Sequence, residues 1–144
     1  MDIFRANSKS FDRDVVSALK LQKVGKSDDS VYEKIKAVAT RKWVTHTTLG
    51  GTFADFFLLS DGRLAAYAVI DLYSVDVERA PWVDGSEKSM RADQFVVIFS
   101  SDESEDIVDE LNDEADSRDP CSDEDYHAAL RRIFADRVGI PTMC

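Results

Sequence analysis

The feature that most restricts the fold of this 144-residue chain is an unbroken apolar run from Leu64 to Ile70, with mostly apolar residues continuing to Tyr73. A strand with one face in water alternates apolar and polar residues, whereas an unbroken apolar run is typical of a central strand covered on both faces. A helix also fits the run, because periodicity alone does not separate the two. The run is far too short for the ~20 residues that cross a bilayer.

The surrounding residues favour the strand. Phe53–Leu59 precedes the run, and the Asp61-Gly62 step between them is typical of a tight hairpin turn with positive φ. Trp43–Leu49 is rich in β-branched and aromatic residues, and Phe95–Phe99 is wholly apolar, so both predict further strands.

Apolar residues at helical spacing predict two helices before these strands. The first begins at Ser8 or Ser10 and is expected to stop near Gly25. The second covers Ser27–Thr40, in which Ser30 and Glu33 have the spacing of a capping box.

Two more helices are predicted after the strands. Asp102 and Glu105 fit the cap of an acidic helix with a thin apolar stripe, and the final helix starts at Ser122 and ends at Gly139. Two helices, four strands and two helices predict a single α+β domain over residues 1–144. Its antiparallel four-stranded meander sheet would carry helices on at least one face.

The acidity of the chain is confined to one segment. Residues 102–125 contain thirteen Asp or Glu and one Arg, a net charge of −12, whereas the whole chain carries −10. The remaining residues have 17 Lys or Arg and 15 Asp or Glu, a net charge of +2. The sequence therefore predicts an acidic helical lobe on a nearly neutral body, and such a lobe favours a basic partner over nucleic acid or an anionic membrane.

Like charges three and four residues apart oppose a helix, so this lobe costs stability. Seven carboxylates from Glu105 to Asp116 correspond to one charge per ~2.6 Å of helix axis, whereas duplex DNA has one per ~1.7 Å. A plain solvated surface remains the alternative to a phosphate-like binding surface. The predicted partner-binding residues are Glu105, Asp106, Asp109, Glu110, Asp113, Glu114, Asp116 and the loop residue Trp82.

Catalytic chemistry has no recognisable motif in this chain. There is no glycine between Gly85 and Gly139, so the acidic lobe cannot form an EF-hand loop. His46 and His127 are each expected to be a structural or surface residue and not a catalytic base. We therefore predict no catalytic residue, metal or cofactor. A carboxylate site around Asp55, Asp71 and Asp76 is the enzymatic alternative.

The hairpin segment Gly50–Gly62 resembles a Gly-Gly-aromatic hairpin of the ArdB anti-restriction family, over thirteen of the 144 residues. Asp61 stands where that pattern has Asn. The resemblance implies an anti-restriction role, and membership of the family is not inferred from it.

Together these patterns predict a non-enzymatic inhibitor that occupies the basic cleft of a nuclease or other nucleic-acid-binding protein, as a phage-type anti-restriction or anti-CRISPR phosphate mimic. The alternatives are an immunity protein that neutralises a bacterial toxin, the small enzyme, and an adaptor subunit. The N-terminal residues contain no apolar signal segment, so we expect a cytoplasmic protein.

Overall fold

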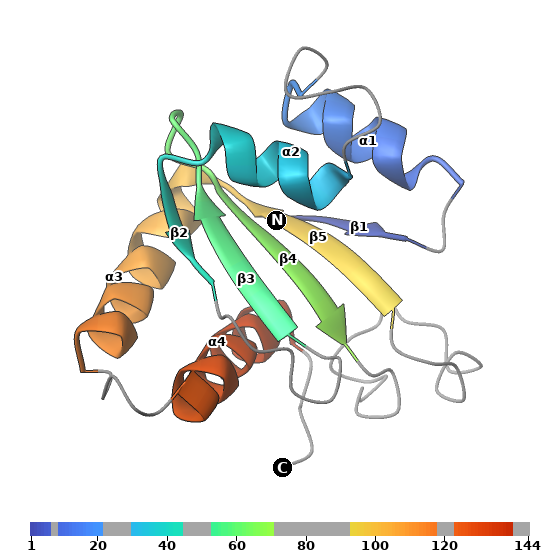
Figure 1. The fold of residues 1–144 in the computed structure, drawn as a ribbon. Helices are drawn as coiled ribbons and strands as arrows, with labels where there is room; N and C mark the ends of the chain where they lie inside the picture. Colours follow the sequence, from blue (N-terminus) through green and yellow to red (C-terminus); the bar gives the residue numbers. More distant parts are fainter. Residues whose placement is uncertain (7–8, 22–29, 45–52, 71–92, 118–122, 140–144) are drawn as a thin grey trace.

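The computed structural model describes residues 1–6, 9–21, 30–44, 53–70, 93–117 and 123–139, and it has three layers (Figure 1). A five-stranded antiparallel sheet with the order β1-β5-β4-β3-β2 forms the middle layer. Its strands are β1 (Asp2–Arg5), β2 (Arg41–Trp43), β3 (Phe53–Leu58), β4 (Leu64–Ile70) and β5 (Asp93–Phe99). Helices α1 (Phe11–Ala18) and α2 (Val31–Val38) cover one face, and α3 (Ser101–Ser117) and α4 (Asp123–Val138) cover the other.

Strands β4 and β5 are buried on both faces. Along β4, Leu64 and Ala66 belong to the core with α3 and α4, while Ala65 and Tyr67 belong to the core with α1 and α2. Strand β5 alternates in the same way. The prediction of a strand covered on both faces is therefore confirmed, and the α+β class with it.

The number of strands was wrong. β1 adds a fifth strand at the edge, pairing antiparallel with β5 through Ile3 opposite Val97 and Phe4 opposite Val96. Ile3 packs against the core under α3 and α4, and Phe4 against the core under α1 and α2. Each core thus gains one apolar side chain from this short strand.

The N-terminal helices are shorter than predicted. α1 ends at Ala18 and not near Gly25, because Lys20 takes a positive φ of 57° just after it. α2 covers Val31–Val38, inside the predicted Ser27–Thr40. Its predicted cap is confirmed, since the Ser30 side chain accepts a hydrogen bond from the backbone N–H of Glu33 at 3.2 Å. The strand predicted over Trp43–Leu49 begins earlier, at Arg41, and residues 45–52 lie outside the described part.

The tight hairpin turn predicted at Asp61-Gly62 is confirmed between β3 and β4, and it contains three residues, 60–62. The Leu59 N–H donates to the Arg63 carbonyl at 2.9 Å, and the Gly62 N–H donates to the Leu59 carbonyl at 3.1 Å. Gly62 supplies the positive φ, 88°, that such a turn requires at its last position. A Cβ at Gly62 would lie 3.3 Å from the Cβ of Ser101, so the turn also approaches the start of α3 closely.

Two fully buried residues, Ile107 and Leu111, attach α3 to the core. They face the apolar stripe of α4, which agrees with the predicted inward face and consists of Tyr126, Ala129, Leu130, Ile133 and Phe134. The acidic segment 102–125 therefore includes an ordered helix packed on the sheet, and its remainder extends to the first turn of α4, with residues 118–122 outside the described part.

We predict that Leu111→Ala lowers the free energy of unfolding by about 2–5 kcal/mol, because it opens a cavity between α3, α4 and the sheet. Leu111→Met, which nearly preserves volume, should cost less than about 1.5 kcal/mol. Urea unfolding followed by circular dichroism measures both. A loss below about 0.5 kcal/mol in the alanine variant, typical of a surface position, would show that α3 is not packed on the core.

Candidate functional site: the acidic face of α3

α3 begins with a reciprocal capping box. The Ser100 hydroxyl accepts a hydrogen bond from the Glu103 N–H at 3.2 Å, and the Glu103 carboxylate accepts one from the Ser100 N–H at 3.0 Å. The predicted cap at Asp102 and Glu105 was therefore wrong by two residues. Glu103 also binds the N-terminal ammonium of Met1 at 3.2 Å. The Ser100 hydrogen bond, with help from that ammonium, lowers the pKa of Glu103.

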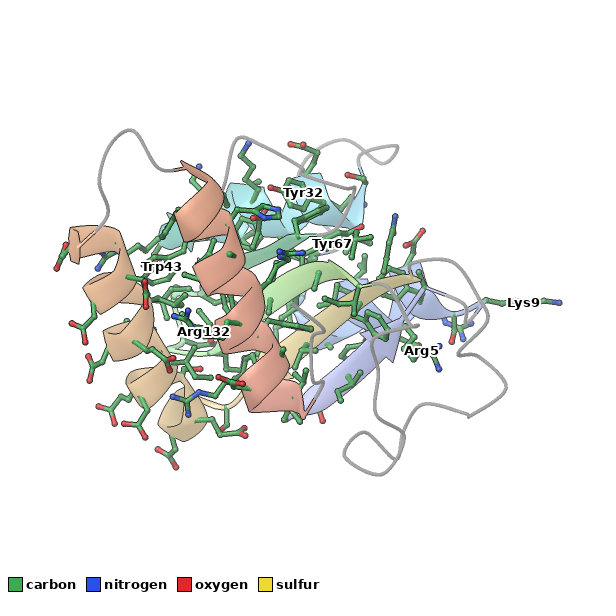
Figure 2. The ribbon with its side chains drawn as sticks, turned by 90° about the horizontal axis from the view of Figure 1, so that it is seen from below. Arg5, Lys9, Tyr32, Trp43, Tyr67 and Arg132 are labelled. Atoms are coloured by element: carbon green, nitrogen blue, oxygen red, sulfur yellow. The ribbon has the colours of Figure 1, made fainter. Side chains whose placement is uncertain are left out.

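Two of the predicted partner-binding carboxylates pair within the molecule. Glu110 lies 2.9 Å from the guanidinium of Arg137, and Glu114 lies 2.8 Å from that of Arg132, both on α4. Both glutamates are half-buried. Figure 2 shows Arg132 extending from α4 toward α3. These two ion pairs bridge α3 and α4 and neutralise carboxylates on the side of α3 that faces α4.

The other five predicted residues of α3 are exposed. Asp106, Asp109, Asp113 and Asp116 follow Asp102 at alternating intervals of four and three residues, so the five aspartates line one face of the helix. We call this row the acidic stripe: Asp102, Asp106, Asp109, Asp113 and Asp116. Glu105 lies beside it. Figure 2 shows the carboxylates along this outer side of α3 pointing away from α4 into solvent.

No stripe residue, nor Glu105, forms an ion pair with any side chain that the structure describes. Fourteen residue steps separate Asp102 from Asp116, or about 21 Å. The six carboxylates over this length that have no ion pair among the described residues give one charge per ~3.5 Å, close to the ~3.4 Å spacing along one DNA strand. This value replaces the denser one from sequence, which also counted the paired Glu110 and Glu114.

The stripe opposes the helix that carries it. Each neighbouring pair of aspartates costs a few tenths of a kcal/mol. Asp116 also lies in the last turn, which contains no basic residue, where the negative end of the helix dipole disfavours a carboxylate. Aspartate is itself a poorer helix former than glutamate. Packing of Ile107 and Leu111 and the capping box offset these costs.

The enzymatic alternative centred on Asp55 lies on the opposite face of the sheet. Asp55 is buried and accepts a hydrogen bond from the Tyr32 hydroxyl at 2.8 Å. Burial, followed by this hydrogen bond, raises the pKa of Tyr32 well above its ordinary value. The Tyr32 ring also packs edge-on against Tyr67, with centroids 5.1 Å apart (Figure 2). This arrangement places Asp55 in a closed aromatic cluster between α2 and the sheet.

Several residues considered from the sequence lie outside the described part of the chain: Trp82, Asp71, Asp76 and His46. The anchoring role of Trp82 therefore stays a prediction. His127 is described, and it is buried in α4.

Among the described residues, no three His, Cys, Asp or Glu side chains gather into a group that could hold a metal ion. In the same part of the chain, none of the helices combines the length and apolar character that a membrane crossing requires.

Sequence reasoning missed the division of α3 into paired and unpaired carboxylates, although the signal was present. Glu110 and Glu114 occupy helical positions beside the apolar Ile107 and Leu111, and α4 carries several arginines. Glutamate reaches one carbon further than aspartate. In α3 the carboxylates that form ion pairs are glutamates, and the exposed row consists of aspartates.

The fold and this surface define an α+β protein with one acidic helical face. Comparison with family models, curated proteins and solved structures finds no match to the chain. The likeness of its hairpin to the anti-restriction family thus stays a thirteen-residue resemblance.

We predict that Glu103→Gln lowers the free energy of unfolding at neutral pH by about 0.5 kcal/mol, because a charged acceptor at the helix start is lost. The folded-state pKa of Glu103 lies below its unfolded value, so its charge stabilises the fold above the unfolded pKa of about 4.3 and ceases to do so as pH falls through the folded value. The difference between wild type and variant should shrink below about pH 4. Urea titrations across pH test this, and a pH-independent difference would contradict it.

We predict that Asp113→Asn with Asp116→Asn raises the free energy of unfolding by about 0.5–1.5 kcal/mol at low salt, because it removes like-charge pairs and an unfavourable charge at the helix end. Added salt should reduce this increase in the free energy of unfolding, because salt screens the charges whose repulsion the variant removes. As a control that removes equal charge, Glu110→Gln with Glu114→Gln should not stabilise the fold, because it breaks two ion pairs. Thermal unfolding at several salt concentrations distinguishes these results, and destabilisation by the aspartate variant would show that the stripe has partners in the fold.

Proposed function

We propose that this protein is a non-enzymatic inhibitor that places the acidic face of α3 in the basic cleft of a nuclease or other nucleic-acid-binding protein, where it takes the place of a phosphate backbone. The acidic stripe carries this proposal. Together with Glu105, its charges have nearly the linear charge density of one DNA strand, and they are carried by an ordered helix.

The choice of residue supports a binding role over simple solubility. Glutamate would give the same charge with better helix propensity, and yet five exposed positions of α3 have aspartate. Aspartate keeps its carboxylate closer to the helix axis and has one fewer rotatable bond. Less side-chain entropy is then lost when the carboxylate pairs with a partner's arginine or lysine.

The pairing within α3 supports the same proposal. The molecule neutralises Glu110 and Glu114 with its own arginines, and the outer carboxylates remain available to a partner's cations. An acidic face on a body of net charge +2 gives a strongly asymmetric charge distribution. Such a distribution orients an approaching basic protein and increases the association rate.

The test begins by finding the partner and then measures its association. The immobilised protein is exposed to host lysate at about 50 mM NaCl, and retained proteins are eluted with duplex DNA. Each purified partner is then assayed for association rate and for nuclease or DNA-binding activity. We expect the eluted partner to be a nucleic-acid-binding protein whose activity this protein inhibits. Its association with this protein should slow steeply between about 50 and 500 mM salt.

A matched pair of variants locates the contact. Asp106→Asn, Asp113→Asn and Asp116→Asn together should slow association about tenfold or more. Asp2→Asn, Asp12→Asn and Glu33→Gln remove the same charge from other elements and should slow it less than about threefold. Equal effects of the two variants, or an association rate independent of salt, would overturn the proposal. An adaptor with a merely solubilising α3 would keep its partner in both variants.

A further inference from the structure

A groove of about 470 Å³ lies between the first half of α3 and the β3–β4 hairpin. Leu58 from β3 and Val108 from α3 contribute apolar surface, and both are only half-buried by the fold. Gly62 lines the groove where the hairpin turn meets α3. Any side chain at Gly62 would narrow the groove, since even a Cβ comes within 3.3 Å of Ser101.

Three carboxylates line the same groove: Asp102, Glu105 and Asp109. They are three and four residues apart on α3, which puts them on neighbouring turns of one face. All three are exposed, and the described residues provide none of them with a cationic partner. The groove thus combines an apolar surface with a negatively charged rim.

We infer that this groove receives an arginine side chain of the basic partner, an inference that rests on the proposed function and names one of its contacts. The methylene groups of the arginine lie on Leu58 and Val108, and its guanidinium pairs with Glu105 and Asp109. Arginine fits better than lysine, because its planar guanidinium binds carboxylates in a bidentate manner and is less strongly hydrated. An arginine that normally binds phosphate has the required chemistry.

The position of the cation within the groove follows from the helix dipole. The N-terminus of α3 carries partial positive charge, which repels a cation at Ser101. Asp102 and Glu103 offset this charge in the first turn. Glu105 and Asp109 lie further along the helix, where the dipole is weak, so the guanidinium is expected beside them.

The test uses N-acetyl-arginine amide and N-acetyl-lysine amide as probes, titrated into isotope-labelled protein and followed by amide chemical shifts. We expect the arginine probe to shift the amides of Gly62, Ser104 and Val108, and to bind at least about threefold more tightly than the lysine probe. Glu105→Gln with Asp109→Asn should weaken arginine binding about fivefold. Asp113→Asn with Asp116→Asn removes equal charge outside the groove and should weaken it less than about twofold.

The Val108→Thr variant tests the apolar contribution of the groove separately from its charge. It preserves the shape and charge of the side chain but makes it polar, so it should weaken arginine binding measurably. Equal loss in both charge variants, equal affinity for the two probes, or shifts spread evenly along α3 would overturn the groove assignment. The triple variant Asp106→Asn, Asp113→Asn, Asp116→Asn separates this inference from the proposed function. If the arginine probe does not bind in the groove but the triple variant still associates slowly with the partner, only this inference is wrong. If the probe binds as expected but the triple variant associates with the partner at the normal rate, the proposed function is wrong.

Discussion

Strands β4 and β5 have apolar side chains on both faces, so each face of the sheet needs a helical cover that the strands themselves cannot supply. α1 and α2 cover one face and α3 and α4 the other (Figure 1). α3 meets this requirement mainly through Ile107 and Leu111, which leaves its outer face free of any packing role. A strongly charged outer face is compatible with the fold because so few residues hold the helix in place.

Elements with strong local patterns could be predicted from the sequence. The apolar run of β4, the cap of α2 at Ser30 and the apolar face of α4 all depend on residues close together in the chain. β1 could not be predicted in this way. Its four residues contribute one apolar side chain to each core, and their strand conformation depends on pairing with β5, more than ninety residues away.

The acidic segment could be predicted from the sequence, but the arrangement of its carboxylates on the surface of the protein could not. Ser100 with Glu103 and Asp102 with Glu105 have the same spacing, and only the position where β5 ends selects the first pair as the cap. The pairing of Glu110 and Glu114 depends in turn on the orientation of α4 against α3, which no local pattern specifies. The helix cap occupies Glu103, and the ion pairs with α4 occupy Glu110 and Glu114. The carboxylates of α3 that remain are the row of aspartates and Glu105, beside the groove.

The three-residue turn between β3 and β4 touches both helical layers. On one side Gly62 lies against Ser101 of α3, and on the other the guanidinium of Arg63 donates a hydrogen bond to the Ala18 carbonyl at the end of α1, at 3.2 Å. Most surface loops tolerate insertions because few contacts hold them. Here we expect an inserted residue to disturb one of these two approaches, and with it the opening beside α3 that Gly62 and Ser101 line.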